Sequence, residues 1–154
     1  MSKQNKERNP WRKRILIAIL VLAVIAATAY WIVATDKFSD TKDRKAAYTV
    51  SALDFINEFQ KNDSVANAKY ADKIVEVNGR VSEIEAADTT LNIKFIDKVT
   101  GSYAIFAFQQ QHVAEAKTIK VGDSVSIKGS CSGSIYSEIL EATAINFKRS
   151  TLNK

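Results

Sequence analysis

The hydrophobic pattern divides the chain into one long uncharged run and a later series of short periodic segments. Residues 15–34 are twenty residues without a charge. A helix of that length rises about 30 Å, the thickness of the hydrocarbon core of a bilayer. Trp11 and Trp31 bracket the run at the spacing of rings placed at the two membrane interfaces. The pattern predicts one N-terminal transmembrane helix over residues 15–34.

A cleaved signal peptide and a buried core helix are the alternatives to an uncleaved anchor. Ala27-Thr28-Ala29 has the small-x-small form of a cleavage site, so cleavage after Ala29 stays open. The apolar run continues to Val33, however, where a cleaved chain normally turns polar. About 120 residues follow, too few to surround a helix that is apolar on every side. No cysteine lies near the run to carry a lipid, which argues against a lipoprotein.

A helical period begins after a polar spacer at residues 35–47. Ser51 is the expected N-cap, with Asp54 at the third helical position as in a capping box. The apolar positions that follow are spaced i, i+3, i+4 and i+7: Ala52, Phe55, Ile56 and Phe59. This spacing gives the helix one face to bury. Asp63 or Ser64 is expected to cap a second short helix that ends at Tyr70.

From residue 73 the period changes to two, which is typical of strands. Gly79 and a phase slip at Ile84 predict a coiled first strand with a bulge. The expected elements are strands at 75–84, 91–95 and 103–108, a helix at 110–118, strands at 123–131 and 138–147, and a connection at 133–137. This order predicts an α+β, mainly β fold: a five-stranded OB-fold barrel preceded by two short helices. The domain is expected over residues 48–149, with a tail at 150–154.

Charge gives the expected orientation. The chain has 22 Lys and Arg against 17 Asp and Glu, and residues 1–14 hold six bases and one acid, so the remaining 16 bases and 16 acids balance. A basic tail at 1–14 predicts a cytoplasmic N-terminus and an outer, periplasmic domain on a single-pass protein of a bacterial inner membrane. The basic excess is thus a topology signal, which disfavours nucleic acid as a partner.

Several segments resemble the tRNA_anti-like family of small bacterial OB-fold proteins, which are common in Bacteroidota. They are Ala52-Leu53, residues 59–63, Ala66, Lys69-Tyr70, Lys73, residues 75–81 and residues 121–133. The resemblance implies an OB-fold behind a lipoprotein signal or a single membrane span; the family name alone is no evidence of tRNA binding. Many members carry a second cysteine where this chain has Thr143.

The residues that could carry chemistry are few. Cys131, the only cysteine, is expected on the inner face of its strand as a small buried side chain, with intermolecular pairing or redox chemistry as alternatives. His112, the only histidine, is expected to be exposed or to form a hydrogen bond at the helix start. Envelope haem chaperones bind haem through a histidine near a tyrosine, but no histidine follows His112 and Tyr136 stands alone. We expect no catalytic residue, cofactor or metal.

A binding surface is the remaining prediction. OB-folds bind ligands on strands two and three and on the adjoining loops. The candidate ligand face is Arg80, Asn92, Lys94, Tyr103, Phe106 and Tyr136, with Ser134 at its rim. Which alternate residues of the third strand face outward stays open. The leading hypothesis is a non-enzymatic, membrane-anchored accessory or envelope module that binds a protein or an envelope component. An oligosaccharide or nucleic-acid binder is the alternative, an enzyme ranks third, and the oligomeric state is not indicated.

Overall fold

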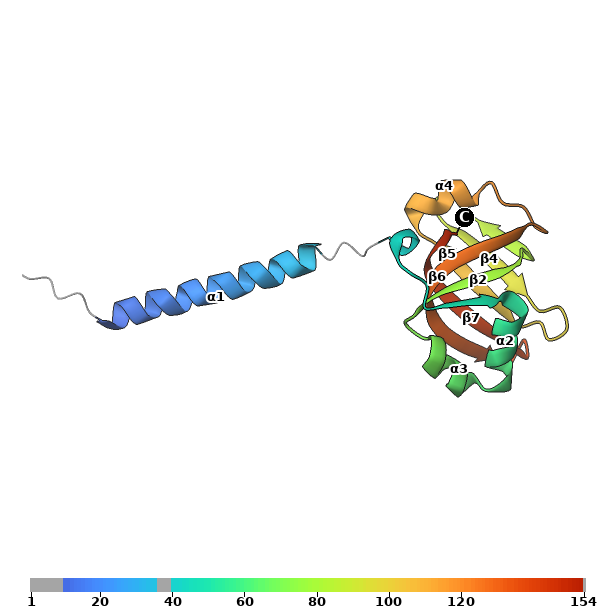
Figure 1. Ribbon diagram of the computed structural model, residues 1–154, viewed down its shortest axis with the longest axis horizontal. Coiled ribbons are helices and arrows are strands. Elements are labelled where there is room, and N and C mark those ends of the chain that lie inside the picture. The colour runs from blue at the N-terminus through green and yellow to red at the C-terminus, as the bar shows by residue number, and fades with distance from the viewer. Residues whose placement is uncertain (1–9, 36–39, 154) are drawn as a thin grey trace, which may run out of the picture. The chain divides into compact units, whose positions relative to one another are not determined.

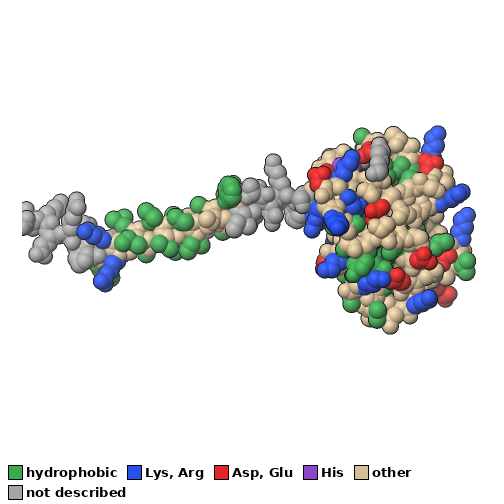
Figure 2. Space-filling model, viewed as in Figure 1, with side chains coloured by type: hydrophobic (Ala, Val, Ile, Leu, Met, Phe, Trp, Pro, Cys, Tyr) green, Lys and Arg blue, Asp and Glu red, His purple; other side chains and the backbone are tan. Residues whose placement is uncertain are grey.

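The computed structural model describes residues 10–35 and 40–153. The chain forms two compact units, one up to residue 39 and one from residue 40 onward. The first contains α1 (Pro10–Thr35). Residues 13–31 of α1 are long and apolar enough to cross a membrane, by length and composition alone, and none of this segment is buried. Figure 2 shows hydrophobic side chains along both visible sides of this helix.

The two helices before the main sheet are confirmed. α2 (Ala52–Lys61) begins at Ser51, whose Oγ accepts a hydrogen bond from the backbone N–H of Asp54 at 3.3 Å. The four residues expected on its apolar face are all buried. α3 (Asp63–Tyr70) is capped by Asn62, one residue before the first expected cap, since Asn62 Oδ1 accepts a hydrogen bond from the N–H of Val65 at 3.1 Å.

Seven strands form one sheet in the described chain, in the order β1-β2-β6-β7-β5-β4-β3. They are β1 (Tyr48–Ser51), β2 (Ile74–Arg80), β3 (Glu83–Ala86), β4 (Leu91–Ile96), β5 (Tyr103–Phe108), β6 (Ser124–Ser137) and β7 (Ala142–Leu152). The sheet curves around the core, with α2 and α3 at one end and α4 (Val113–Ala116) at the other (Figure 1). The prediction of five strands in a barrel is therefore wrong in number, and the hydrogen-bonded order does not close.

The extra strands have separate causes. The expected first strand breaks at Val81 and Ser82, whose N–H groups bond to the carbonyls of Asp123 and Lys94 respectively. The part before this break is β2, which pairs with β6, and the part after it is β3, which pairs with β4. With those two taken as halves of one strand, the expected order of strands and helix is confirmed. β1 was not predicted. It lies between the polar spacer and α2, and it pairs in parallel with β2.

The last two strands are longer than expected. β6 continues to Ser137, so the predicted connection at 133–137 is strand, and residues 138–141 form the turn. Gly133, with φ of +91°, lies at a register shift that lets β6 bend and continue. β7 continues into the predicted tail as far as Leu152, and Ser150 and Thr151 are buried. The expected helix at 110–118 is shorter: a 3₁₀ turn, η2 (Gln110–His112), followed by α4.

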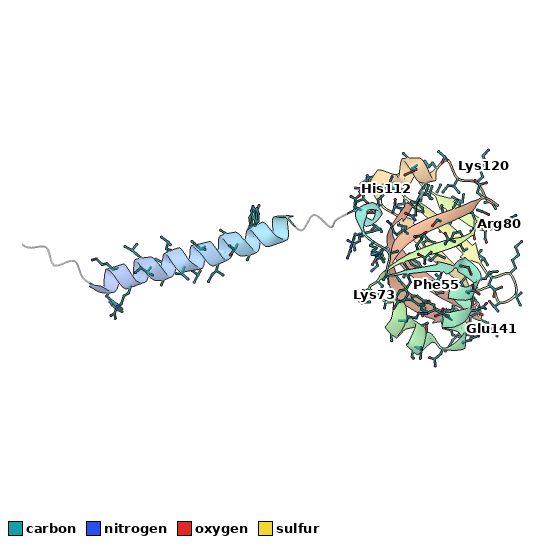
Figure 3. All side chains as sticks on the ribbon, viewed as in Figure 1. Phe55, Lys73, Arg80, His112, Lys120 and Glu141 are labelled. Carbon is teal, nitrogen blue, oxygen red and sulfur yellow. The ribbon has the colours of Figure 1, made fainter. Side chains whose placement is uncertain are left out.

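An aromatic cluster joins the helices to the sheet. Phe55 of α2 contacts Tyr70 of α3 at a centroid distance of 4.9 Å and Phe147 of β7 at 5.5 Å. Phe147 in turn stacks on Phe106 of β5 at 4.3 Å. Figure 3 shows Phe55 directed inward from α2. These rings come from both helices and from two central strands of the sheet, so helices and sheet share one core.

Candidate functional site

The outer face of β4 and β5 carries three of the six predicted ligand residues. Asn92, Lys94 and Tyr103 are each partly exposed. Lys94 Nζ forms ion pairs with Glu85 and, at 3.5 Å, with Glu83, and it lies 5.4 Å from the centre of the Tyr103 ring. The hydrogen bond that Lys94 donates to Glu85 raises the pKa of Lys94. Lys94, the one cation among these three residues, is therefore already neutralised by two carboxylates of β3.

Phe106 is not part of that face, which corrects the prediction. It is fully buried and contacts Phe95 at 5.2 Å as well as Phe147. The alternation of β5 is thus settled, because Ala104, Phe106 and Phe108 point inward and Tyr103 and Ile105 point outward. Both alternating sets of residues on β5 are apolar, so the sequence alone could not predict which set faces inward.

Arg80 and Tyr136 lie apart from the predicted face. Arg80 ends β2 and Tyr136 is near the end of β6, where its side chain is exposed. Ser134 is held by Asn67 and Asp63 of α3. The six predicted residues therefore do not form one surface: three share the β4–β5 face, one is in the core, and two lie elsewhere.

A cleft of about 750 Å³ opens between the start of α2, the end of β2 and the loop that joins β4 to β5. Its size is typical of ligand-binding clefts. Ile56 and Phe95, both buried, line it together with Gly79. Three exposed apolar side chains also line it: Leu53 is 57% exposed, Val99 92% and Val121 63%. Exposed apolar side chains gathered at one hollow are typical of a binding surface.

Local sequence explains how the cleft is built. A Cβ on Gly79 would lie 2.7 Å from Cβ of Ala52, so only glycine lets α2 approach β2 this closely. Across the cleft, Asp97 accepts hydrogen bonds from the N–H of Val99 at 2.9 Å and the hydroxyl of Thr100 at 2.8 Å. These bonds lower the pKa of Asp97. They fix the loop as a turn with Val99 on the outside.

The cleft is basic at its edge. Arg80 and Lys98 line it, both exposed, and neither forms an ion pair with any residue that the structure describes. Asp97 is occupied by the loop. The site therefore offers an apolar surface and two available cations. Figure 3 shows Arg80 on the opposite side of the domain from His112 and Lys73.

Leu53, Lys98, Val99 and Val121 are site residues that the sequence analysis did not identify. The available signal was Leu53, which lies off the apolar face of an otherwise regular amphipathic helix. Val99 and Val121 each stand alone in a turn, and an isolated apolar turn residue does not by itself indicate a site.

His112 and Cys131 occupy structural positions. Of the two alternatives expected for His112, exposure is wrong, because the residue is 9% exposed. It forms a hydrogen bond, but to the carboxylate of Asp40, 2.8 Å from its Nε2, and its side chain does not cap α4. Burial opposes ionisation of Asp40, but hydrogen bonds from the N–H of Lys42 and from His112 and Gln111 outweigh it and lower its pKa. Burial raises the pKa of Cys131 to about 11. Within residues 10–35 and 40–153, no three His, Cys, Asp or Glu side chains group as a metal site.

The fold and cleft define a mainly β domain that follows an apolar helix in the sequence and has a surface suited to binding. The tRNA_anti-like family model matches residues 7–142, and the chain belongs to that family. No curated protein matches. A similar solved structure is that of a Klebsiella pneumoniae protein described as a "putative nucleic acid-binding lipoprotein". The identity is 17% over 68% of this chain and 91% of the other, with a TM-score of 0.53, so the likeness extends to the fold.

Proposed function

We propose that the protein is a non-enzymatic, membrane-anchored binding module whose cleft receives an apolar segment of a partner protein on the extracytoplasmic side. The observation that carries the proposal is the cleft itself. Leu53, Val99 and Val121 expose apolar surface around a hollow with a buried floor. Such surface is costly to leave in water, and covering it stabilises a complex.

The location rests on the N-terminal part of the chain. The apolar segment of α1 satisfies the length of a membrane span, and residues 1–14 hold six bases against one acid. We propose the cytoplasmic side of a bacterial inner membrane for that tail and the periplasm for the domain. A periplasm-dependent reporter fused after residue 154 then gives activity, and the same reporter at residue 1 gives none; the reverse pattern contradicts the orientation.

Nucleic-acid binding is the alternative, and its support is the description of the Klebsiella protein. Single-strand binders combine a positive groove with stacking rings. Here Lys94 is paired with Glu83 and Glu85 beside Tyr103, and the chain after residue 14 has equal numbers of acids and bases. Two available cations at the cleft supply only a weak electrostatic contribution. These observations favour a protein partner.

Affinity capture from solubilised membranes tests the cleft with matched variants. Leu53→Asp puts a charge into the cleft at the first turn of α2, where an acid is favourable for the helix. Val65→Asp is the control: Val65 is 62% exposed in the first turn of α3 and outside the cleft. Proteins retained by the unchanged chain and by Val65→Asp, and lost with Leu53→Asp, support the proposal. Equal retention by both variants, or no retained protein, overturns it.

A further inference from the structure

The turn between β6 and β7 exposes a second apolar surface, which we call the hairpin tip: residues 135–141. Four of its side chains are large, apolar and exposed: Ile135 is 68% exposed, Tyr136 61%, Ile139 94% and Leu140 66%. Natural hairpin turns are normally polar, because nothing in a monomer covers them. This concentration at the end of one hairpin indicates a surface that another molecule covers.

The charges of the hairpin tip are acidic. Glu138 and Glu141 flank Ile139 and Leu140, and neither carboxylate forms an ion pair among the residues that the structure describes. Two carboxylates around an inserted apolar pair oppose insertion into a membrane with anionic lipids. They fit instead a protein surface that is apolar at its centre and basic at its edge.

The cleft of this same chain has that character. Its centre is apolar, formed by Leu53, Val99 and Val121, and its edge carries Arg80 and Lys98. Its volume of about 750 Å³ exceeds that of two aliphatic side chains. The two surfaces are thus complementary both in apolar character and in charge.

The β4–β5 loop connects the two surfaces: Val99 of this loop lines the cleft, and Ser102, at the loop's end, accepts a hydrogen bond from the N–H of Thr143 at the start of β7. Figure 3 places Arg80 and Glu141 on the same side of the domain. Two copies facing each other on that side can therefore each present a tip to the other's cleft, an exchange that closes as a symmetric pair.

From these observations we infer that the hairpin tip of one copy occupies the cleft of a second copy, with Ile139 and Leu140 in the apolar centre and Glu138 and Glu141 facing Arg80 and Lys98. The inference rests on the proposed function and names the partner segment as one from the chain itself. Anchoring in one membrane raises the effective concentration of the copies, so a small contact area suffices for association.

Disulfide trapping in membranes tests the contact with the full chain. Two differently tagged copies are co-expressed, one with Val99→Cys and the other with Ile139→Cys. The native Cys131 is fully buried and does not compete. In the control the first copy carries Lys73→Cys, since Lys73 is exposed on the opposite side of the domain (Figure 3). We expect a mixed-tag dimer with the first pair at about tenfold the amount given by the control pair.

Charge reversal then tests which groups meet. Arg80→Glu with Lys98→Glu in the Val99→Cys copy, or Glu138→Lys with Glu141→Lys in the Ile139→Cys copy, is expected to lower the trapped dimer about tenfold, because like charges then face each other. Both reversals together are expected to restore it. All these residues are exposed, so folding is not at issue.

The possible outcomes separate the two proposals. Equal trapping by the test and control pairs, or no rescue by the combined reversal, overturns the inference of a second copy. If foreign proteins are still captured by the unchanged chain and lost with Leu53→Asp, the proposed function stands without it. If neither trapping nor capture depends on the cleft, both fall.

Discussion

The contact between Gly79 and Ala52 gives a sharp prediction about how the cleft is built. Replacing Gly79 by alanine places a Cβ 2.7 Å from Cβ of Ala52 and 3.3 Å from the ring of Phe95. Carbon atoms pack best at about 3.5–4.0 Å, so the first contact overlaps by about 0.8 Å. Neither neighbour is the free end of a flexible side chain, and α2 must move away from β2. Overpacking of this kind costs about 1–3 kcal/mol.

Thermal unfolding of residues 40–154 measures the effect. At about 4 °C per kcal/mol for a domain of this size, Gly79→Ala is expected to lower Tm by about 4–12 °C. Asn78→Ala is the control on the same strand, because the side chain of Asn78 is exposed. Adding Ala52→Gly removes the methyl group that clashes and is expected to recover at least half of the loss, a coupling that only a direct contact produces. A Tm within about 1 °C of the unchanged domain for Gly79→Ala alone would refute the packing described here.

Three further predictions concern other parts of the domain. Because Cys131 is buried and its pKa is raised to about 11, a thiol reagent at pH 7.5 is expected to label it only after unfolding, and rapid native labelling contradicts its burial. The pKa of Asp40 is lowered from 3.8 in the folded domain, so its contribution to stability is present above the unfolded value and lost as pH falls through the folded one. Asp40→Asn is therefore expected to cost about 1 kcal/mol at pH 7 in denaturant titrations and nothing near pH 2, and a cost independent of pH would count against the ionised pairing with His112. The domain without residues 1–35 is expected to show no micromolar affinity for single-stranded DNA or RNA at physiological salt by fluorescence anisotropy; affinity that is lost on changing Lys94 or Tyr103 would reverse the preference for a protein partner.

Local patterns predicted the parts of the fold that local physics determines. The N-cap at Ser51 and the buried face of α2 follow from residues within one or two helical turns. The strand expected at 91–95 forms as β4, and its alternating apolar residues Leu91, Ile93 and Phe95 are all buried. Such elements were predictable because each carries its own period and its own termination signal.

Elements that depend on distant partners were not predictable from the sequence. β1 exists because its backbone pairs with β2, and the four residues Tyr48–Ser51 have no distinctive pattern of their own. β7 continues to Leu152 because Ile127 of β6 lies opposite it. The same limit applies to the site: Leu53, Val99 and Val121 come from three separate segments, and only the folded chain brings them to one cleft.

The central claim is that this cleft, and not the face of β4 and β5, is the binding surface of a domain held at a membrane. Site-specific photocross-linking in intact membranes compares the two surfaces in the full chain, with the photoreactive residue at Val99 in the cleft or at Tyr103 on the strand face. Val99 is 92% exposed, whereas Tyr103 is partly exposed beside Lys94. The account predicts protein adducts from position 99, abolished by Leu53→Asp, and none from position 103. Adducts from position 103 with none from position 99 would contradict it.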